Sequence, residues 1–175
     1  MKGGRISKPH ARCGWTRFRG DARRLNTEAL AQGSDPARAL ALEAAAVALD
    51  PYDREIAGNL GYFLARKGDA SGANLVAVYA LSLPRNGATD TGRGADWQLL
   101  GSSYAKLGKP DNSLAAYYVA LAITPNLSGL CSSLLAQQAA LGDELKAPID
   151  VLFQRIQQRG QDSTDGCSYP PRWRN

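Results

Sequence analysis

The chain has 175 residues, of which 44% are hydrophobic and 21% are charged, so it is long enough for one globular domain and too apolar for a disordered polymer. No segment has the roughly 20 consecutive apolar residues that span a bilayer, and no apolar segment follows the basic start as in a secretory signal. As written, the sequence predicts a cytoplasmic protein, or a periplasmic or envelope-associated one if a signal segment is missing from this start.

The formal net charge of +5 is concentrated at the N-terminus, where residues 1–24 hold eight basic groups and one acid. We expect this segment to be a disordered arm. Two interpretations remain open: a solvated tail that takes no part in the fold, and an arm that contacts phosphates and stacks on unpaired bases. Anionic lipid would attract the same charge. The second interpretation depends on interleaved cations and aromatic rings, namely Arg12, Trp15, Arg17, Phe18 and Arg19.

Helices follow the arm in chain order. Asn26 to Gln32 predicts no more than a short turn of helix, and Asp35, Asp69 and Asp111 are expected to cap later helices. The segment after Pro148 has one apolar face, which suits a terminal capping helix. The tail at 159–175 is rich in Gly, Ser, Asp and Pro and is expected to be irregular. Helices are predicted over 36–49, 53–67, 70–83, 94–107, 111–123, 128–141 and 147–158.

A repeat is visible in the spacing of these elements. The segment from Trp97 to Tyr104 fits the pattern W-x2-L-G-x2-Y at all four fixed positions. The turn positions stand 34, 40 and 34 residues apart, and they are Ser34, Gly68, Gly108 and Gly142. The sequence therefore resembles the tetratricopeptide repeat family. The resemblance implies an all-α, right-handed superhelical array of about three to four antiparallel helix pairs over residues 25–158. Small residues at Gly61 and Gly101 are expected to let the paired helices approach closely.

The resemblance also implies a groove lined by the first helix of each pair. Such a groove suits a noncatalytic scaffold or adaptor that binds a peptide or helix of a partner protein. The alternatives are an envelope, secretion or pilus assembly factor with the same fold, and a nucleic-acid-associated protein acting through the basic arm. The groove side chains carried over from the family, with Asn59 standing in for the side chain that Gly58 lacks, are Asn59, Tyr62, Arg66, Gln98, Ser102 and Lys106.

Catalytic and metal chemistry find little support in the residue types. The one histidine, His10, lies in the basic arm, so a hydrolase triad or a metal cluster has no grouped ligands. The three cysteines have no CxxC spacing. Unpaired thiols and a disulfide between Cys131 and Cys167 both remain open. We expect no cofactor and no metal.

Overall fold

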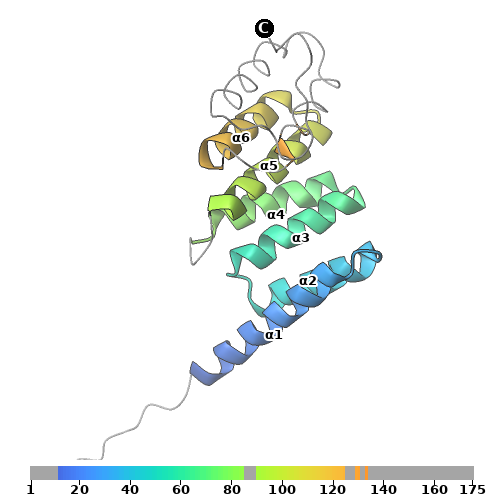
Figure 1. Ribbon diagram of the computed structural model, residues 1–175, viewed down its shortest axis with the longest axis vertical. Helices are drawn as coiled ribbons and strands as arrows, with labels where there is room; N and C mark the ends of the chain where they lie inside the picture. The colour runs from blue at the N-terminus through green and yellow to red at the C-terminus, as the bar shows by residue number, and fades with distance from the viewer. Residues whose placement is uncertain (1–11, 85–89, 125–128, 131–132, 134–175) are drawn as a thin grey trace, which may run out of the picture.

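The computed structural model describes residues 12–84, 90–124, 129–130 and 133. In this part of the chain every helix or strand assigned is an α-helix, and Figure 1 shows the helices following one another along the long axis. The predicted helix at 147–158 and the tail at 159–175 lie outside the described residues, as do Cys131, Cys167 and nearly all of 128–141. The helices are α1 (Arg12–Ala31), α2 (Pro36–Leu49), α3 (Arg54–Lys67), α4 (Ala70–Ser82), α5 (Asp90–Lys106) and α6 (Pro110–Ile123).

Aspartate side chains cap the starts of α2, α3 and α4. The Asp35 carboxylate accepts a hydrogen bond from the Arg38 amide at 3.0 Å, and Asp69 accepts one from the Gly72 amide at 2.8 Å, so both predicted caps are confirmed. The prediction for Asp111 is wrong. Helix α6 begins one residue earlier at Pro110, because the fixed φ of proline suits the first helical position. Asp111 therefore lies inside the first turn, where its charge faces the positive end of the helix dipole.

Helix α1 differs most from the prediction. The expected disordered arm over residues 1–24 is wrong for residues 12–24, which belong to a 20-residue helix. Two small side chains, seven residues apart on one face, explain the helix. Ala22 packs with Ala46 and Ile56, and Ala29 packs in the same way with Ala39 and Phe63. Burial against α2 and α3 therefore stabilises a helix whose exposed surface is rich in arginine.

Each helix packs against the next one in the sequence, and α1 also contacts α3, as α3 contacts α5. The first helices of the three pairs therefore form one continuous row. Helices α2 and α4 each pack between two of these first helices, and α6 packs against α5. The first helices are therefore exposed on the side that points away from the second helices. The second helices are exposed on the side that points away from the first helices.

Two glycines allow this close packing. A Cβ atom on Gly61 would lie 2.8 Å from Leu99 Cδ2, and one on Gly101 would lie 2.9 Å from the Tyr117 ring. Ser113 Oγ donates to the Gly101 carbonyl oxygen at 2.7 Å across the same contact. Both separations are shorter than real Cβ contacts. The expected close approach of paired helices is confirmed at Gly101, which faces α6, whereas the tightest contact of Gly61 is with α5 of the next pair.

Candidate functional site

The row of first helices presents one aromatic side chain to solvent in the middle of the array. Tyr62 on α3 is 50% exposed, and its ring meets the Phe63 ring edge-on with centroids 5.5 Å apart. The Arg66 guanidinium lies over the Tyr62 ring at 5.8 Å from its centroid. This cation–π contact holds both side chains in place while leaving them accessible. Lys106 is exposed in the last turn of α5.

Three of the six predicted groove residues make side-chain hydrogen bonds within the chain. Asn59 Nδ2 donates to Asn26 Oδ1 on α1 at 2.8 Å, and Gln98 Nε2 donates to Ser133 Oγ at 3.1 Å. Ser102 Oγ donates to the Leu99 carbonyl oxygen within its own helix at 2.9 Å. Asn59 and Gln98 therefore bridge neighbouring units, which leaves Tyr62, Arg66 and Lys106 as the exposed members of the set.

A buried carboxyl lies behind this face, and sequence reasoning missed it. Glu43 on α2 is fully buried. Turning the Asn26 amide brings its NH2 group 2.8 Å from Glu43 Oε1, and the same amide faces Asn59. Glu43, Asn26 and Asn59 therefore join α2, α1 and α3 in one polar network. The signal in the sequence is a lone acid in an otherwise uncharged run of alanine, leucine and valine, from Ala39 to Leu49.

The surroundings of Glu43 favour its neutral form. Burial, together with the negative charges of Glu55 and Asp53, raises the pKa of Glu43 to about 7. In the neutral form the Glu43 hydroxyl can donate to Asn26 Oδ1 alongside Asn59 Nδ2. In the ionised form the Asn26 amide has to turn and present its NH2 group. The network thus has two hydrogen-bonding arrangements, separated by one proton.

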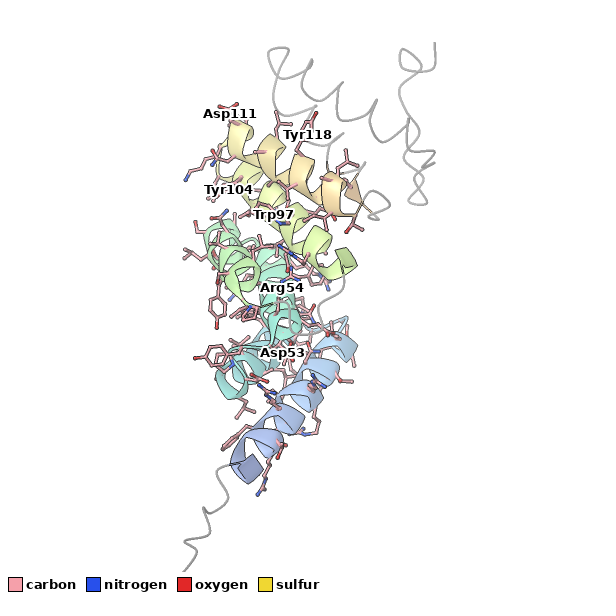
Figure 2. The ribbon with its side chains drawn as sticks, turned by 90° about the vertical axis from the view of Figure 1, so that its left-hand side faces the viewer. Asp53, Arg54, Trp97, Tyr104, Asp111 and Tyr118 are labelled. Atoms are coloured by element: carbon pink, nitrogen blue, oxygen red, sulfur yellow. The ribbon has the colours of Figure 1, made fainter. Side chains whose placement is uncertain are left out.

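A buried ion pair joins the second and third helix pairs. The Arg54 guanidinium on α3 binds the Asp96 carboxylate on α5, and Arg54 Nε donates to the Ala80 carbonyl oxygen on α4 at 3.1 Å. A Cβ atom on Gly58 would lie 2.6 Å from Asp96 Oδ1, so glycine is needed there to admit the carboxylate. Figure 2 shows Arg54 at the level of this junction, below Trp97 of α5. Burial raises the pKa of Asp96 to about 6, despite the opposing charge of Arg54.

The arginines of the predicted arm are partly paired with acids of the helical body. Arg19 Nε lies 3.3 Å from Asp50 Oδ2, and Arg23 Nε lies 3.7 Å from Asp53 Oδ2. Phe18 is 50% exposed, and Arg17 is also exposed. The side chains of Arg12 and Trp15 lie outside the described part of the structure. Of the five predicted arm residues, the structure therefore shows Arg19 in an ion pair with Asp50 at the C-terminal end of α2.

Two further observations concern the described residues only. Among them, no group of three or more His, Cys, Asp and Glu side chains is placed to hold a metal ion, and none of their helices combines the length and apolarity that crossing a membrane requires. No protein-family model and no curated protein matches the chain.

Proposed function

We propose that this chain is a noncatalytic scaffold of tetratricopeptide type, whose helix pairs stack as a right-handed superhelix and bind a segment of a partner protein. The observation that carries the proposal is the accessible Tyr62–Arg66 pair on a row of first helices that contact one another directly. A continuous helical face with a fixed aromatic ring and a cation is typical of peptide recognition.

The charges on this face indicate the chemistry of the bound segment. Arg66 and Lys106 each lie in the last turn of a first helix, and they are 40 residues apart, the spacing of the enlarged repeat. Guanidinium and ammonium groups bind carboxylates by charge-assisted hydrogen bonds. We therefore expect the partner segment to carry acidic side chains and an apolar group that packs on the Tyr62 ring.

Replacement of the two cations tests this assignment. The Arg66→Glu and Lys106→Glu variants should each lose the partner proteins that the wild-type chain retains, because a carboxylate repels an acidic segment. The measurement is affinity capture from native extract, with bound proteins identified by quantitative mass spectrometry. Lys67→Glu is the matched control, since Lys67 is exposed in the same turn as Arg66 but points about 100° away around the helix.

Equal recovery of the same partners by the wild type and both charge-reversed variants would contradict the proposed face. Loss in all three variants, the Lys67→Glu control included, would indicate a response to net charge and would contradict it as well. The ion pairs of Arg19 and Arg23 favour a protein partner over nucleic acid, because a cation that already neutralises a carboxylate contributes less to binding a phosphate.

A further inference from the structure

The exposed side of α4 is uncharged along its whole length and apolar at its centre. Its outermost positions follow the helical spacing i, i+4, i+7 and i+11, and they are Ser71, Leu75, Val78 and Ser82, all exposed. Leu75 is 72% exposed and Val78 is 47% exposed. The opposite side, with Ala73, Ala77 and Ala80, is fully buried against α3 and α5. Helix α4 contains no charged residue on any side.

Side chains next to this stripe enlarge the apolar surface. Tyr79 is 38% exposed, and its hydroxyl donates to the Pro51 carbonyl oxygen in the loop between α2 and α3. The adjacent Tyr52 is 61% exposed. The bond between Tyr79 and Pro51 therefore ties the loop to α4 and brings the two tyrosines to the same region. Exposed apolar groups gathered in this way mark interaction surfaces in soluble proteins.

The equivalent positions on the neighbouring second helices are small and nearly uncharged. The positions of α2 that lie 34 residues before the α4 stripe are all exposed alanines, namely Ala37, Ala41, Ala44 and Ala48. Helix α6 has Asp111, Ala115, Tyr118 and Ala122 at the positions 40 residues after it. Asp111 is the single charge among these twelve positions. The exposed stripe thus carries larger apolar side chains on α4 and alanine methyl groups on α2.

The order of side chains along α4 is symmetric. Small Ser71 and Ser82 stand at the two ends, and larger Leu75 and Val78 stand at the two central positions. An antiparallel copy of the same helix, related by a two-fold axis between Leu75 and Val78, would place Leu75 against Val78 of the copy and Ser71 against Ser82 of the copy. An isologous interface requires this self-complementarity, because one patch has to match itself.

We propose that the chain forms a homodimer through antiparallel packing of α4 against α4 of a second copy. A second copy of α4 is a suitable occupant because neither side of the contact would then carry a charge. Helix α4 brings no charged group to the interface. An acidic or basic partner would gain no ion pair there, and would lose the hydration of its own charges. A stable dimer buries about 800 Å² on each copy, so Tyr52, Tyr79 and the α2 alanines take part beside the central ridge.

Complementary charges at the two central positions test the antiparallel register. The wild-type chain should sediment as a dimer. Leu75→Lys and Val78→Glu should each weaken association by about a hundredfold or more, because each places a charge against an apolar side chain of the copy. An equimolar mixture of the two variants should form a heterodimer, since the introduced lysine then faces the introduced glutamate and the remaining Leu75 faces the remaining Val78.

Analytical ultracentrifugation over a range of concentrations measures each of these states. Leu30→Lys is the matched control and should remain a dimer, because Leu30 is 51% exposed on α1 and lies outside the proposed interface. Circular dichroism verifies that all variants are folded. A monomeric wild type overturns the proposal. If the wild type is monomeric and Leu75→Lys lowers the melting temperature, another part of the same chain covers the face. A dimer insensitive to both variants, or no association in the mixture, also overturns it.

Discussion

Glu43 is the clearest case of a single side chain whose environment decides its chemistry. Its carboxyl is fully buried, and its amide partner Asn26 also binds Asn59. Burial disfavours the charged form, and Asp53 and Glu55 add repulsion rather than relief. The first two helix pairs are therefore joined by a group that gives up its proton close to neutral pH.

This environment predicts how stability depends on pH. With a pKa of 4.5 for the ordinary group and about 7 in the fold, the folded chain retains a proton at Glu43 that the unfolded chain releases. The contribution of Glu43 to stability is therefore highest below pH 4.5, falls as the pH rises through this window, and levels off above about 7. Asp96, raised from 3.8 to about 6, acts in the same direction.

Glu43→Gln should remove most of this dependence. Glutamine keeps the shape of the side chain and a hydrogen bond to Asn26, and it carries no charge at any pH. We expect the variant to be more stable than the wild type by about 1–3 kcal/mol at about pH 8, and similar to it at about pH 4.5. Urea denaturation at both pH values measures the difference. Glu28→Gln, at a surface ion pair with Arg38, is the control and should change stability little. An equal effect of Glu43→Gln at both pH values would contradict the assignment.

Two glycines in helix interiors should respond oppositely to alanine. Gly101→Ala should cost about 1–3 kcal/mol, because the new Cβ atom would lie 2.9 Å from the buried Tyr117 ring. Gly20→Ala should stabilise α1 by about 0.5–1 kcal/mol, since no atom lies within 4 Å of the added methyl group and alanine is the better helix former. Chemical denaturation of both variants measures the pair. The packing argument is wrong if Gly101→Ala is also stabilising.

The predicted site residues share a helix face, and whether they bind a partner stays a prediction. The spacing that proposes Tyr62, Arg66 and Lys106 also proposes Asn59 and Gln98, which bind side chains in adjacent units. A helix spacing shows which residues share a face. It does not show whether a neighbouring helix lies within hydrogen-bonding distance of that face. The pair of Arg54 and Asp96 was missed because its members are 42 residues apart in different helices.

At the scale of elements, the sequence predicts helices well where caps and breakers mark their ends. Helix α2 was predicted with its observed bounds, and α3 and α4 to within one residue. Helix α1 was missed because its buried positions are small, with Ala22 and Ala29 surrounded by arginines. Its stability depends on tertiary packing, which local propensity does not report. Helix α5 begins four residues before the predicted start, at Asp90.

The contact between α3 and α5 should depend on both members of its ion pair. Asp96→Leu leaves the buried Arg54 guanidinium without an oxygen acceptor on α5 and should cost about 3–5 kcal/mol. The double variant Arg54→Met, Asp96→Leu should recover most of that loss, because it removes both charges and fills the space with apolar atoms. A double-mutant cycle by urea denaturation, completed with both single variants of that pair, measures the coupling. Additive losses would show that the two groups act independently and would contradict the assignment.

At the scale of the whole molecule, the main contacts among the described helices join each helix pair to its neighbours. An array of this kind is stabilised by a sum of local interfaces, so its ends open more readily than its centre. Among the described helices, α3 has contacts with α1, α2, α4 and α5. We therefore expect the slowest amide hydrogen exchange in α3 and faster exchange in α1, as measured by mass spectrometry of peptic fragments. Uniform protection along the array would indicate a single cooperative unit instead.

The proposed dimer through the uncharged outer side of α4 would change how tightly the proposed Tyr62–Arg66 face holds a partner segment. The exposed side of α4 points away from the row of first helices. A pair of chains joined there therefore presents two recognition faces that point in different directions. Two copies of a weakly held segment on one target, or on one surface, would then be captured together. The second capture becomes intramolecular, and the gain is set by the distance between segments rather than by any added contact. Modest affinity at Tyr62 and Arg66 would thereby become durable attachment to clustered targets, and a brief encounter with dispersed ones.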